Sequence, residues 1–477
     1  MRCKQGMCLF QTLDCKLLQL QSGGRGHINA FHSTGRRQDS LRASNAEMPT
    51  KNVSATKATA KASAKPLTPA QQERETARKL REKAAKKRAS QKNARDQKKA
   101  DAEALEQRRL NDPMSFCRWP DTDEDGLTMP PFPTDAMRLG FPVKVMGAPD
   151  LKSNDTRGWR KDPHLRVSLG YLCDIFAYLR QHDIRMYRMA SDLAPYATHP
   201  DMPQFHNMVE ESRADLEHVG KLAKAQGLRL SFHPSQYIVL NSENAELTRR
   251  SVADLQSQAT MLDYMELPPE AIMVIHVGGA YGDRKTGCDN WVKTWKTLSE
   301  PIRRRMVLEN DDIRFSAADV LSIHERTGVK CVFDYQHHWC MNPERLEMVP
   351  TLEKFLKTWP AGVRPKMHFS CARTEMREMK RKSRVTGVNE TVLMPPIWTG
   401  HADFNNPFET ITFLRSIQHL ETDIMLESKA KDLSLLRLRN DIAKYAPELA
   451  PRYGIKLNAP VEDAGEIVEE DDEIEAD

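Results

Sequence analysis

Short hydrophobic runs alternate with longer amphipathic stretches from about residue 137 onward. The runs are MRLGF, IRMYRMAS, RLSFH, AIMVIH, RMVLE, CVFD, PKMH and DIMLE. Apolar runs of four to six residues are typical of strands buried on both faces of a parallel sheet. The stretches between them, such as 166–182, carry apolar residues at helical spacing, and each is long enough for a right-handed βαβ crossover. The pattern predicts an α/β fold, a (β/α)₈ TIM barrel over 135–450.

The last six of these runs each end on a residue that can bind a metal. These residues are His233, His276, Glu309, Asp334, His368 and Glu427. One such residue at a strand end is more often structural than a ligand. However, the carboxyl ends of barrel strands meet at one mouth, and six unpaired groups there would be costly without a cation. Two further histidines, His199 and His337, lie within reach. We therefore predict a polynuclear metal centre.

Metal identity is constrained by the ligand chemistry. Mixed imidazole and carboxylate ligands suit Mn²⁺, Zn²⁺, Fe²⁺ or Co²⁺, whereas Mg²⁺ prefers oxygen alone. Because no cysteine ligand is evident, Mn²⁺ or Zn²⁺ is expected.

Charge is placed at the two ends of the chain. Residues 1–110 carry 25 Lys and Arg against 10 Asp and Glu, residues 461–477 carry 10 acidic residues and no basic ones, and the region between is neutral. We expect a basic extension over 48–130, with low complexity at 49–70 and a charged helix from about 68 to 110, and an acidic tail over 461–477. The basic extension either holds phosphate backbones or is merely solvated. The acidic tail either competes with DNA for it or aids solubility.

The first 47 residues and the cysteines bear on the compartment. Residues 1–47 are poor in acid and fit either a transit peptide or an upstream extension before Met48. Nine cysteines without a CxxC pair favour a reducing compartment over a disulfide scaffold. No run of 18 apolar residues predicts a membrane span. We expect an intracellular protein, in the cytoplasm or nucleoid, or in a nucleus or mitochondrion.

Seven segments resemble, in order, the motifs of the UV-damage endonuclease family. They are LAPYATHP, SFHPSQY, VIHVGGAYGD, LENDD, FDYQHH, PKMHFS and MLESKAK. The resemblance covers about 137–430. It implies a TIM barrel related to the endonuclease IV and xylose-isomerase types, which nicks DNA 5′ of ultraviolet photoproducts. It also implies up to three Mn²⁺, held by His199, His233, His276, Glu309, Asp334, His337, His368 and Glu427, with Glu309 as a bridging carboxylate.

Further roles follow from the same resemblance. Gln236 and Tyr237 resemble a pair that probes or wedges the duplex at the lesion, although Tyr237 could instead pack on the barrel rim. Lys366 would act on substrate phosphate, or as a carbamate if modified. His401 would lie near the scissile phosphate, His338 would support a ligand, and Lys429 would bind phosphate.

The chain departs from the family pattern near its first strand. Phe141 and Val145 stand where a tyrosine and an asparagine are frequent in the family. Phe141 can stack on a base but cannot donate a hydrogen bond, a difference that bears on the range of lesions recognised.

The expected reaction is hydrolysis of a DNA phosphodiester, leaving a 3′-hydroxyl and a 5′-phosphate, by a protein that acts as a monomer on damaged double-stranded DNA. Glu309, Lys366 and His401 are the expected catalytic residues. One alternative is a sugar isomerase or epimerase, because Glu309, Asp334, His368 and Glu427 alone would suit a single Mn²⁺. Another is a damage-binding protein without catalysis.

Overall fold

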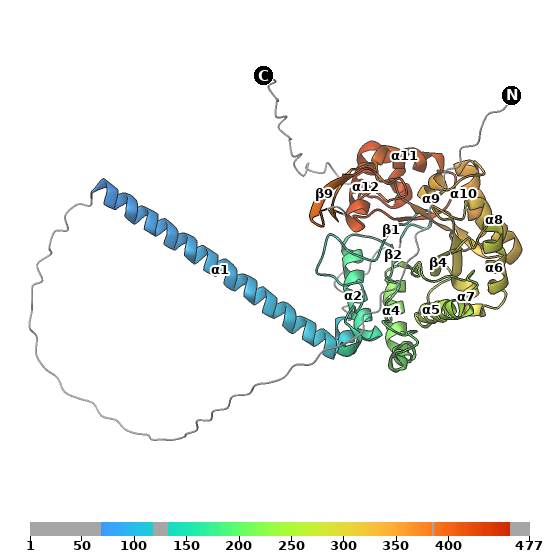
Figure 1. The fold of residues 1–477 in the computed structure, drawn as a ribbon, viewed down its shortest axis with the longest axis horizontal. Coiled ribbons are helices and arrows are strands. Elements are labelled where there is room, and N and C mark those ends of the chain that lie inside the picture. The colour runs from blue at the N-terminus through green and yellow to red at the C-terminus, as the bar shows by residue number, and fades with distance from the viewer. Residues whose placement is uncertain (1–67, 118–131, 384–385, 458–477) are drawn as a thin grey trace, which may run out of the picture. The chain divides into compact units, whose positions relative to one another are not determined.

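A computed structural model describes residues 68–117, 132–383 and 386–457 of the chain (Figure 1). The predictions for 1–47, for most of the low-complexity segment and for the acidic tail lie outside these residues. Contacts between residues divide the described chain into a part up to residue 83 and a part from residue 84, and the elements below are described without placing one part on the other.

Eight strands form one parallel sheet in the order β6-β5-β4-β3-β2-β1-β10-β7. The strands are β1 Leu139–Pro142, β2 Met186–Arg188, β3 Arg229–Phe232, β4 Ile272–His276, β5 Met306–Glu309, β6 Lys330–Val332, β7 Lys366–Phe369 and β10 Asp423–Leu426. A parallel bridge between Asp334 and His368 joins the two ends of the order and closes the sheet. All eight overlap the hydrophobic runs of the sequence, so the predicted TIM barrel is confirmed.

Helices cover the outside of the sheet (Figure 1). They are α2 Leu165–Gln181, α3 Met208–Glu211, α4 Arg213–Ala225, α5 Ala245–Tyr264, α6 Arg284–Trp295, α7 Glu300–Arg305, α8 Ala317–Thr327, α9 Tyr335–Cys340, α10 Met348–Leu356, α11 Pro407–Ser416 and α12 Asp432–Tyr445. Short 3₁₀ turns lie at η1 Pro113–Phe116, η3 Trp159–Lys161, η4 Pro203–Phe205, η5 Pro447–Leu449 and η6 Pro451–Tyr453.

Local sequence signals fix the ends of α8. Ser316 accepts the backbone N–H of Asp319 while the Asp319 carboxylate accepts the backbone N–H of Ser316, a reciprocal capping box. The helix ends at Gly328, whose φ of 74° is readily adopted only without a side chain. The βα connections around it are therefore short and well defined.

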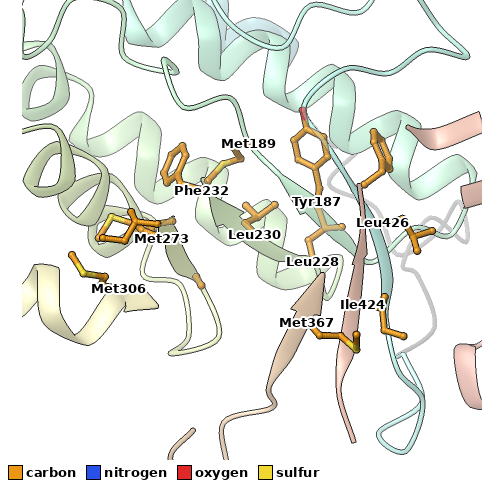
Figure 2. Packing of buried hydrophobic residues seen from close by; sticks show 14 of the residues in the cluster. Tyr187, Met189, Leu228, Leu230, Phe232, Met273, Met306, Met367, Ile424 and Leu426 are labelled. Atoms are coloured by element: carbon orange, nitrogen blue, oxygen red, sulfur yellow. The ribbon is translucent and has the colours of Figure 1, made fainter. Parts of the chain in front are cut away.

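Strand alternation divides the buried side chains into two layers. In β4, Met273 and Ile275 pack toward the helices, whereas Ile272 and Val274 join Val307, Val332 and Trp359 in a separate cluster inside the barrel. Figure 2 shows part of the layer under the helices, with Met273 of β4, Met306 of β5 and Met367 of β7. Because side chains alternate with period 2, His276 and Glu309 have the same parity as Val274 and Val307 and face the barrel interior.

Helix α1 Pro69–Asn111 forms where the charged helix was predicted, and nearly all of its residues are exposed. Its last turns pack on the barrel helix α2. The buried Arg109 forms an ion pair with Asp174 at 2.6 Å and donates to the carbonyl oxygen of Gly170. No sequence pattern predicted this packing, because a single buried arginine leaves no apolar stripe.

Cys117, just after α1 and η1, forms a disulfide with Cys173 of α2. The sequence analysis, which favoured a reducing compartment over a disulfide scaffold, did not predict this pair. The two residues lie 56 positions apart, and only the packing of η1 against α2 brings them together. Among the described cysteines, Cys288, Cys331, Cys340 and Cys371 are free.

A two-stranded antiparallel hairpin, β8 Arg377–Lys382 with β9 Asn389–Met394, lies between β7 and α11. The sequence analysis did not predict it, because polar and charged residues occupy both of its faces and no apolar alternation results. None of the described helices is long and apolar enough to cross a membrane.

Candidate metal centre

The candidate metal ligands of the barrel continue the interior-facing positions of their strands. His276 and Glu309 end β4 and β5 and are paired in the strand register, and Asp334 and His368 form the bridge that closes the sheet. Since the strands are parallel, all these side chains converge at the carboxyl-terminal mouth. This register is what brings the predicted groups to one mouth.

Glu309 lies at the centre of the group and is completely buried. Its Oε1 lies 2.7 Å from His368 Nδ1, and its Oε2 lies 3.0 Å from His233 Nε2 and 3.5 Å from His276 Nε2. His337 Nδ1 is 3.7 Å from Glu309 Oε1. One carboxylate therefore contacts four imidazoles. Burial alone would raise the pKa of Glu309, but His368 and His276 outweigh it and hold that pKa well below its ordinary value.

Three groups of side chains have ligand atoms within 4.8 Å of one another: His233, Glu309 and His368; Glu309, Asp334 and His337; and Asp334, His368 and Glu427. Shared members join the groups into one cluster. Asp334 Oδ2 and His368 Nε2 are buried and have no hydrogen-bond partner. Uncompensated buried lone pairs are costly, and a cation would satisfy them. The residues present therefore fit divalent metal ions.

Asp334 and His337 form an acidic and basic pair next to Glu309, with His337 Nδ1 3.7 Å from Asp334 Oδ1. Burial raises the pKa of Asp334 to about 7. Burial would lower the pKa of His337, but the carboxylates of Asp334, Glu309 and Glu427 raise it to about 9. His337 Nδ1–H also donates to the carbonyl oxygen of Asn310 at 2.9 Å, which leaves Nε2 available for a metal.

Glu427 connects the cluster to a cation that the sequence analysis did not consider. Its Oε1 lies 3.3 Å from His368 Nδ1 and 2.5 Å from Arg188 Nη1. Burial would raise the pKa of Glu427, but Arg188 and then His368 lower it well below its ordinary value. Arg188 ends β2 at the position where other strands carry ligands. Arginine does not bind metals, so the run IRMYR predicts a strand but no ligand at its end.

Lys366 begins β7 and is completely buried inside the barrel, two residues before His368. Its Nζ lies 3.3 Å from Ser231 Oγ. Burial, together with Arg229 and Arg188, lowers the pKa of Lys366 well below its ordinary value. Lys366 therefore lies beneath the cluster and has no exposed surface.

His401 is held by a chain of hydrogen bonds that fixes its tautomer. Gln336 Nε2 donates to the carbonyl oxygens of Trp398 and Gly400, so Gln336 Oε1 must accept, and it accepts the Ser370 hydroxyl at 2.5 Å. Ser370 Oγ is then left to accept from His401 Nδ1–H at 2.7 Å. His401 Nε2, 3.8 Å from Glu427 Oε2, consequently carries a lone pair. Burial lowers the pKa of His401 to about 4, so the ring is neutral at pH 7.

Two predicted histidines lie apart from this arrangement. His199 packs edge-on against Tyr196 at 6.2 Å and caps the backbone N–H of Asp201, and it belongs to none of the three ligand groups found among the described residues. His338 donates to the carbonyl oxygen of Leu346 at 3.0 Å and packs on Phe333. Neither residue is brought to Glu309 in this structure.

The residues predicted to contact DNA fall into two sets. Tyr237, 74% exposed, and Gln236 lie in the loop after β3, and Lys429 is exposed after β10, where its backbone N–H donates to Ala402 next to His401. Phe141, by contrast, has no exposed surface and packs edge-on against Tyr187 at 5.5 Å. A ring in the core cannot stack on a base, so Phe141 does not belong to the DNA contact that we propose below.

A cavity of about 560 Å³ opens beside the cluster. Three histidines of the mouth line it, His276, His337 and His401, together with Gln236, Tyr281 and Arg314. The loop that forms its floor passes through Gly278 at φ 114°, a conformation that L side chains rarely adopt, and a Cβ there would meet Asn241 Oδ1 at 2.4 Å. Tyr281 and Arg314 were not singled out from the sequence.

The fold and the cluster together define a TIM barrel whose mouth carries a buried set of imidazoles and carboxylates that could hold a metal. The model of the UV-endonuclease UvdE family matches residues 165–451. The chain belongs to this family, and it is a nuclease.

Individual relatives agree with this assignment. The chain is 32% identical over 294 residues to a UV DNA damage endonuclease of Bacillus velezensis, covering 60% of this chain and 85% of that protein. It is 33% identical over 263 residues to one of Bacillus pumilus, covering 55% and 76%. The crystal structure of SacUVDE is similar with a TM-score of 0.53 at 28% identity, covering 65% of this chain and 98% of that one.

Proposed function

We propose that the protein nicks DNA immediately 5′ of ultraviolet photoproducts by metal-dependent hydrolysis of a phosphodiester, leaving a 3′-hydroxyl and a 5′-phosphate. The observation that carries this proposal is the position of Glu309, a buried carboxylate in contact with four imidazoles at the barrel mouth. Family membership supports ultraviolet-damaged DNA as the substrate.

The cluster would hold up to three divalent ions, with Mn²⁺ preferred and Zn²⁺ as the other choice. We assign as ligands His233, His276, Glu309, Asp334, His337, His368 and Glu427, and keep His199 as a candidate that would have to move from its position beside Tyr196. When bound, the ions would supply an activated water and stabilise charge on the attacked phosphate. Glu309 would be shared between two ions, because its two oxygens face different histidines.

The chain's own residues would orient the phosphate and move protons. His401 presents an unprotonated Nε2 toward the mouth, so it can accept a proton or hold a water but cannot act as an acid at pH 7 without first being charged. Lys366, buried below the cluster, would act through the electrostatics of Glu309 and Glu427 or as a carbamate. Lys429 would neutralise a backbone phosphate from the rim.

Lesion recognition would fall to the loop after β3. Tyr237 has 74% of its surface exposed and Gln236 borders the cavity of the cluster, so both can enter a duplex at a weakened base pair. A distorted duplex lowers the cost of unstacking, which would favour photoproducts over intact DNA.

The test is a nicking assay on ultraviolet-irradiated plasmid with Mn²⁺ and, in parallel, with EDTA. Nicking of irradiated DNA alone, dependent on metal, is the expected result, and end-labelled oligonucleotides with one photoproduct would report the cut position and the termini. The absence of metal-dependent nicking would overturn the proposal in favour of a damage-binding protein. A metal content of one ion per chain, rather than about three, would favour the sugar isomerase reading. We expect a monomer, which light scattering can test.

A further inference from the structure

The β8–β9 hairpin leaves the barrel at the mouth that holds the cluster. Its two legs are tied together at their base by an antiparallel bridge between Ala372 and His401 and by the backbone N–H of Arg373, which donates to Gly400 at 2.8 Å. Ala372 follows the end of β7, and His401 is part of the site described above. The hairpin is therefore anchored within a few residues of the reaction centre. In Figure 1 its strand β9 lies at the edge of the barrel.

The strand register divides the hairpin into two faces. Arg377, Met379 and Arg381 pair with Met394, Val392 and Glu390 on an inner face, and Glu378, Lys380 and Lys382 pair with Leu393, Thr391 and Asn389 on an outer face. The inner face is partly covered, and Arg377 holds its base through an ion pair with Asp403 at 2.6 Å. Every residue of the outer face is exposed.

The outer face is an uncovered surface that carries cationic and polar side chains. A two-stranded hairpin is marginally stable by itself, and among the described residues no element packs on this face. Lys380 and Lys382 lie next to each other on it, and no ion pair with either lysine occurs in the described part of the chain. Their cross-strand neighbours Thr391 and Asn389 add neutral hydrogen-bonding groups. The distal half of the face is thus cationic and polar, the chemistry that binds backbone phosphates.

We propose that this outer face of the β8–β9 hairpin binds the phosphate backbone of double-stranded DNA flanking the nicked position. The inference rests on the proposed function, since it takes DNA as the substrate of the neighbouring site. A two-stranded ribbon fits the width of a duplex groove, and lysine contacts to phosphate hold the duplex without reading its sequence. The hairpin would add affinity and orientation, while the cluster would supply chemistry.

The test compares the wild-type protein with the double variant K380A/K382A on a duplex with one photoproduct and on the same duplex undamaged. We expect weaker binding of both duplexes by similar factors. The slope of log affinity against log salt should become less steep by about 2, since each phosphate contact contributes about 0.9. The ratio of wild-type affinity to variant affinity should therefore shrink by about tenfold between roughly 50 and 200 mM salt.

A matched control removes the same charge elsewhere. The control is K354A/K357A, which changes two exposed lysines at the C-terminal end of α10, one of the helices around the barrel. It should leave the salt slope unchanged. An equal change in both double variants would show a general charge effect and overturn the assignment. A loss confined to damaged DNA would overturn it as well, because it would indicate lesion recognition instead of backbone contact.

The outcome also separates this inference from the proposed function. At low salt and saturating protein, K380A/K382A should nick irradiated DNA as the wild type does. If K380A/K382A nicks at the wild-type rate and its salt slope is unchanged, the hairpin does not bind DNA and the proposed nuclease function stands. A reduced slope in a protein that does not nick would keep the hairpin and reject the proposed reaction.

Discussion

His368 Nδ1 lies 2.7 Å from Glu309 Oε1, and neither side chain is exposed to solvent. The two residues come from strands that are not neighbours in the sheet, so the contact crosses the barrel interior. A buried carboxylate and a neutral imidazole with an unpartnered Nε2 are stable together only if the remaining lone pairs are satisfied. The pair therefore links the stability of the mouth to the ion that it would hold.

Substituting Glu309 with Gln tests this link. We expect E309Q to lose at least one metal ion per chain. Its rate of nicking irradiated DNA should fall by more than ~100-fold, because losing a ligand should cost more than losing a residue that only hydrogen-bonds to a ligand. Elemental analysis and the nicking assay measure the two effects. E325Q, on the exposed side of α8, is the control for loss of one carboxylate. Wild-type metal content in E309Q would contradict the assignment of Glu309 as a shared ligand.

Chelation should destabilise the folded protein, because Asp334 Oδ2 would then remain buried without a partner. We expect a lower melting temperature in EDTA than in Mn²⁺ for the wild type and a smaller difference for E309Q. Differential scanning calorimetry gives both values. An identical melting temperature with and without the chelator would argue that the buried groups hold no ion.

Ser370 should act on the reaction through His401, whose Nδ1–H it accepts. S370A removes that acceptor without touching the three ligand groups, so nicking should fall by about 10–100-fold while metal content stays at the wild-type level. The decisive readout is the ¹⁵N spectrum of His401: the wild type should show the Nδ1–H tautomer alone, and S370A a mixture. If S370A nicks more slowly but the tautomer of His401 is unchanged, Ser370 acts only through packing.

Lys330 gives the protein a pH-dependent stability away from the mouth. Burial, and then Arg305 and Arg229, lower the pKa of Lys330 from 10.5 to about 8. Below pH 8 Lys330 is charged in both the folded and the unfolded protein, and burying that charge destabilises the folded protein. Between pH 8 and 10.5 the unfolded chain binds more protons than the folded protein, so the free energy of unfolding rises with pH. The shift corresponds to at most about 3 kcal/mol.

K330M removes the buried charge and keeps most of the aliphatic chain. Since it also loses the hydrogen bond to the Arg304 carbonyl oxygen, we expect a net gain of about 1–2 kcal/mol in the free energy of unfolding at pH 7. The gain should disappear by about pH 10.5, as measured by denaturant titration at both values. A constant gain at both pH values would mean that Lys330 titrates normally.

The disulfide between Cys117 and Cys173 should stabilise the packing of the α1 end on α2. Closing a loop of this length contributes up to about 4 kcal/mol through the unfolded state. Dithiothreitol should lower the melting temperature of the wild type and leave that of C117A/C173A unchanged. Equal sensitivity of both proteins would show that the effect arises from another cysteine.

Much of this protein follows from local order in the sequence. Each apolar run that ends on His, Asp or Glu specified both a strand and the chemistry at its end, because period-2 alternation and the shared direction of parallel strands bring those ends together. The run MVLE at 306–309 is sufficient to bury Val307 and Glu309 inside the barrel. The charged helix over 69–111 likewise follows from composition alone.

Other features were settled only by tertiary packing. Arg188 pairs with Glu427, 239 residues away, and the Gln336, Ser370 and His401 chain depends on where one loop folds back on the mouth. Phe141 lies in the core and His199 beside Tyr196 because side-chain direction depends on neighbouring elements, which a motif does not specify. Sequence fixes the strand-end residues through local periodicity, whereas contacts between distant segments depend on the free energy of the whole packed barrel.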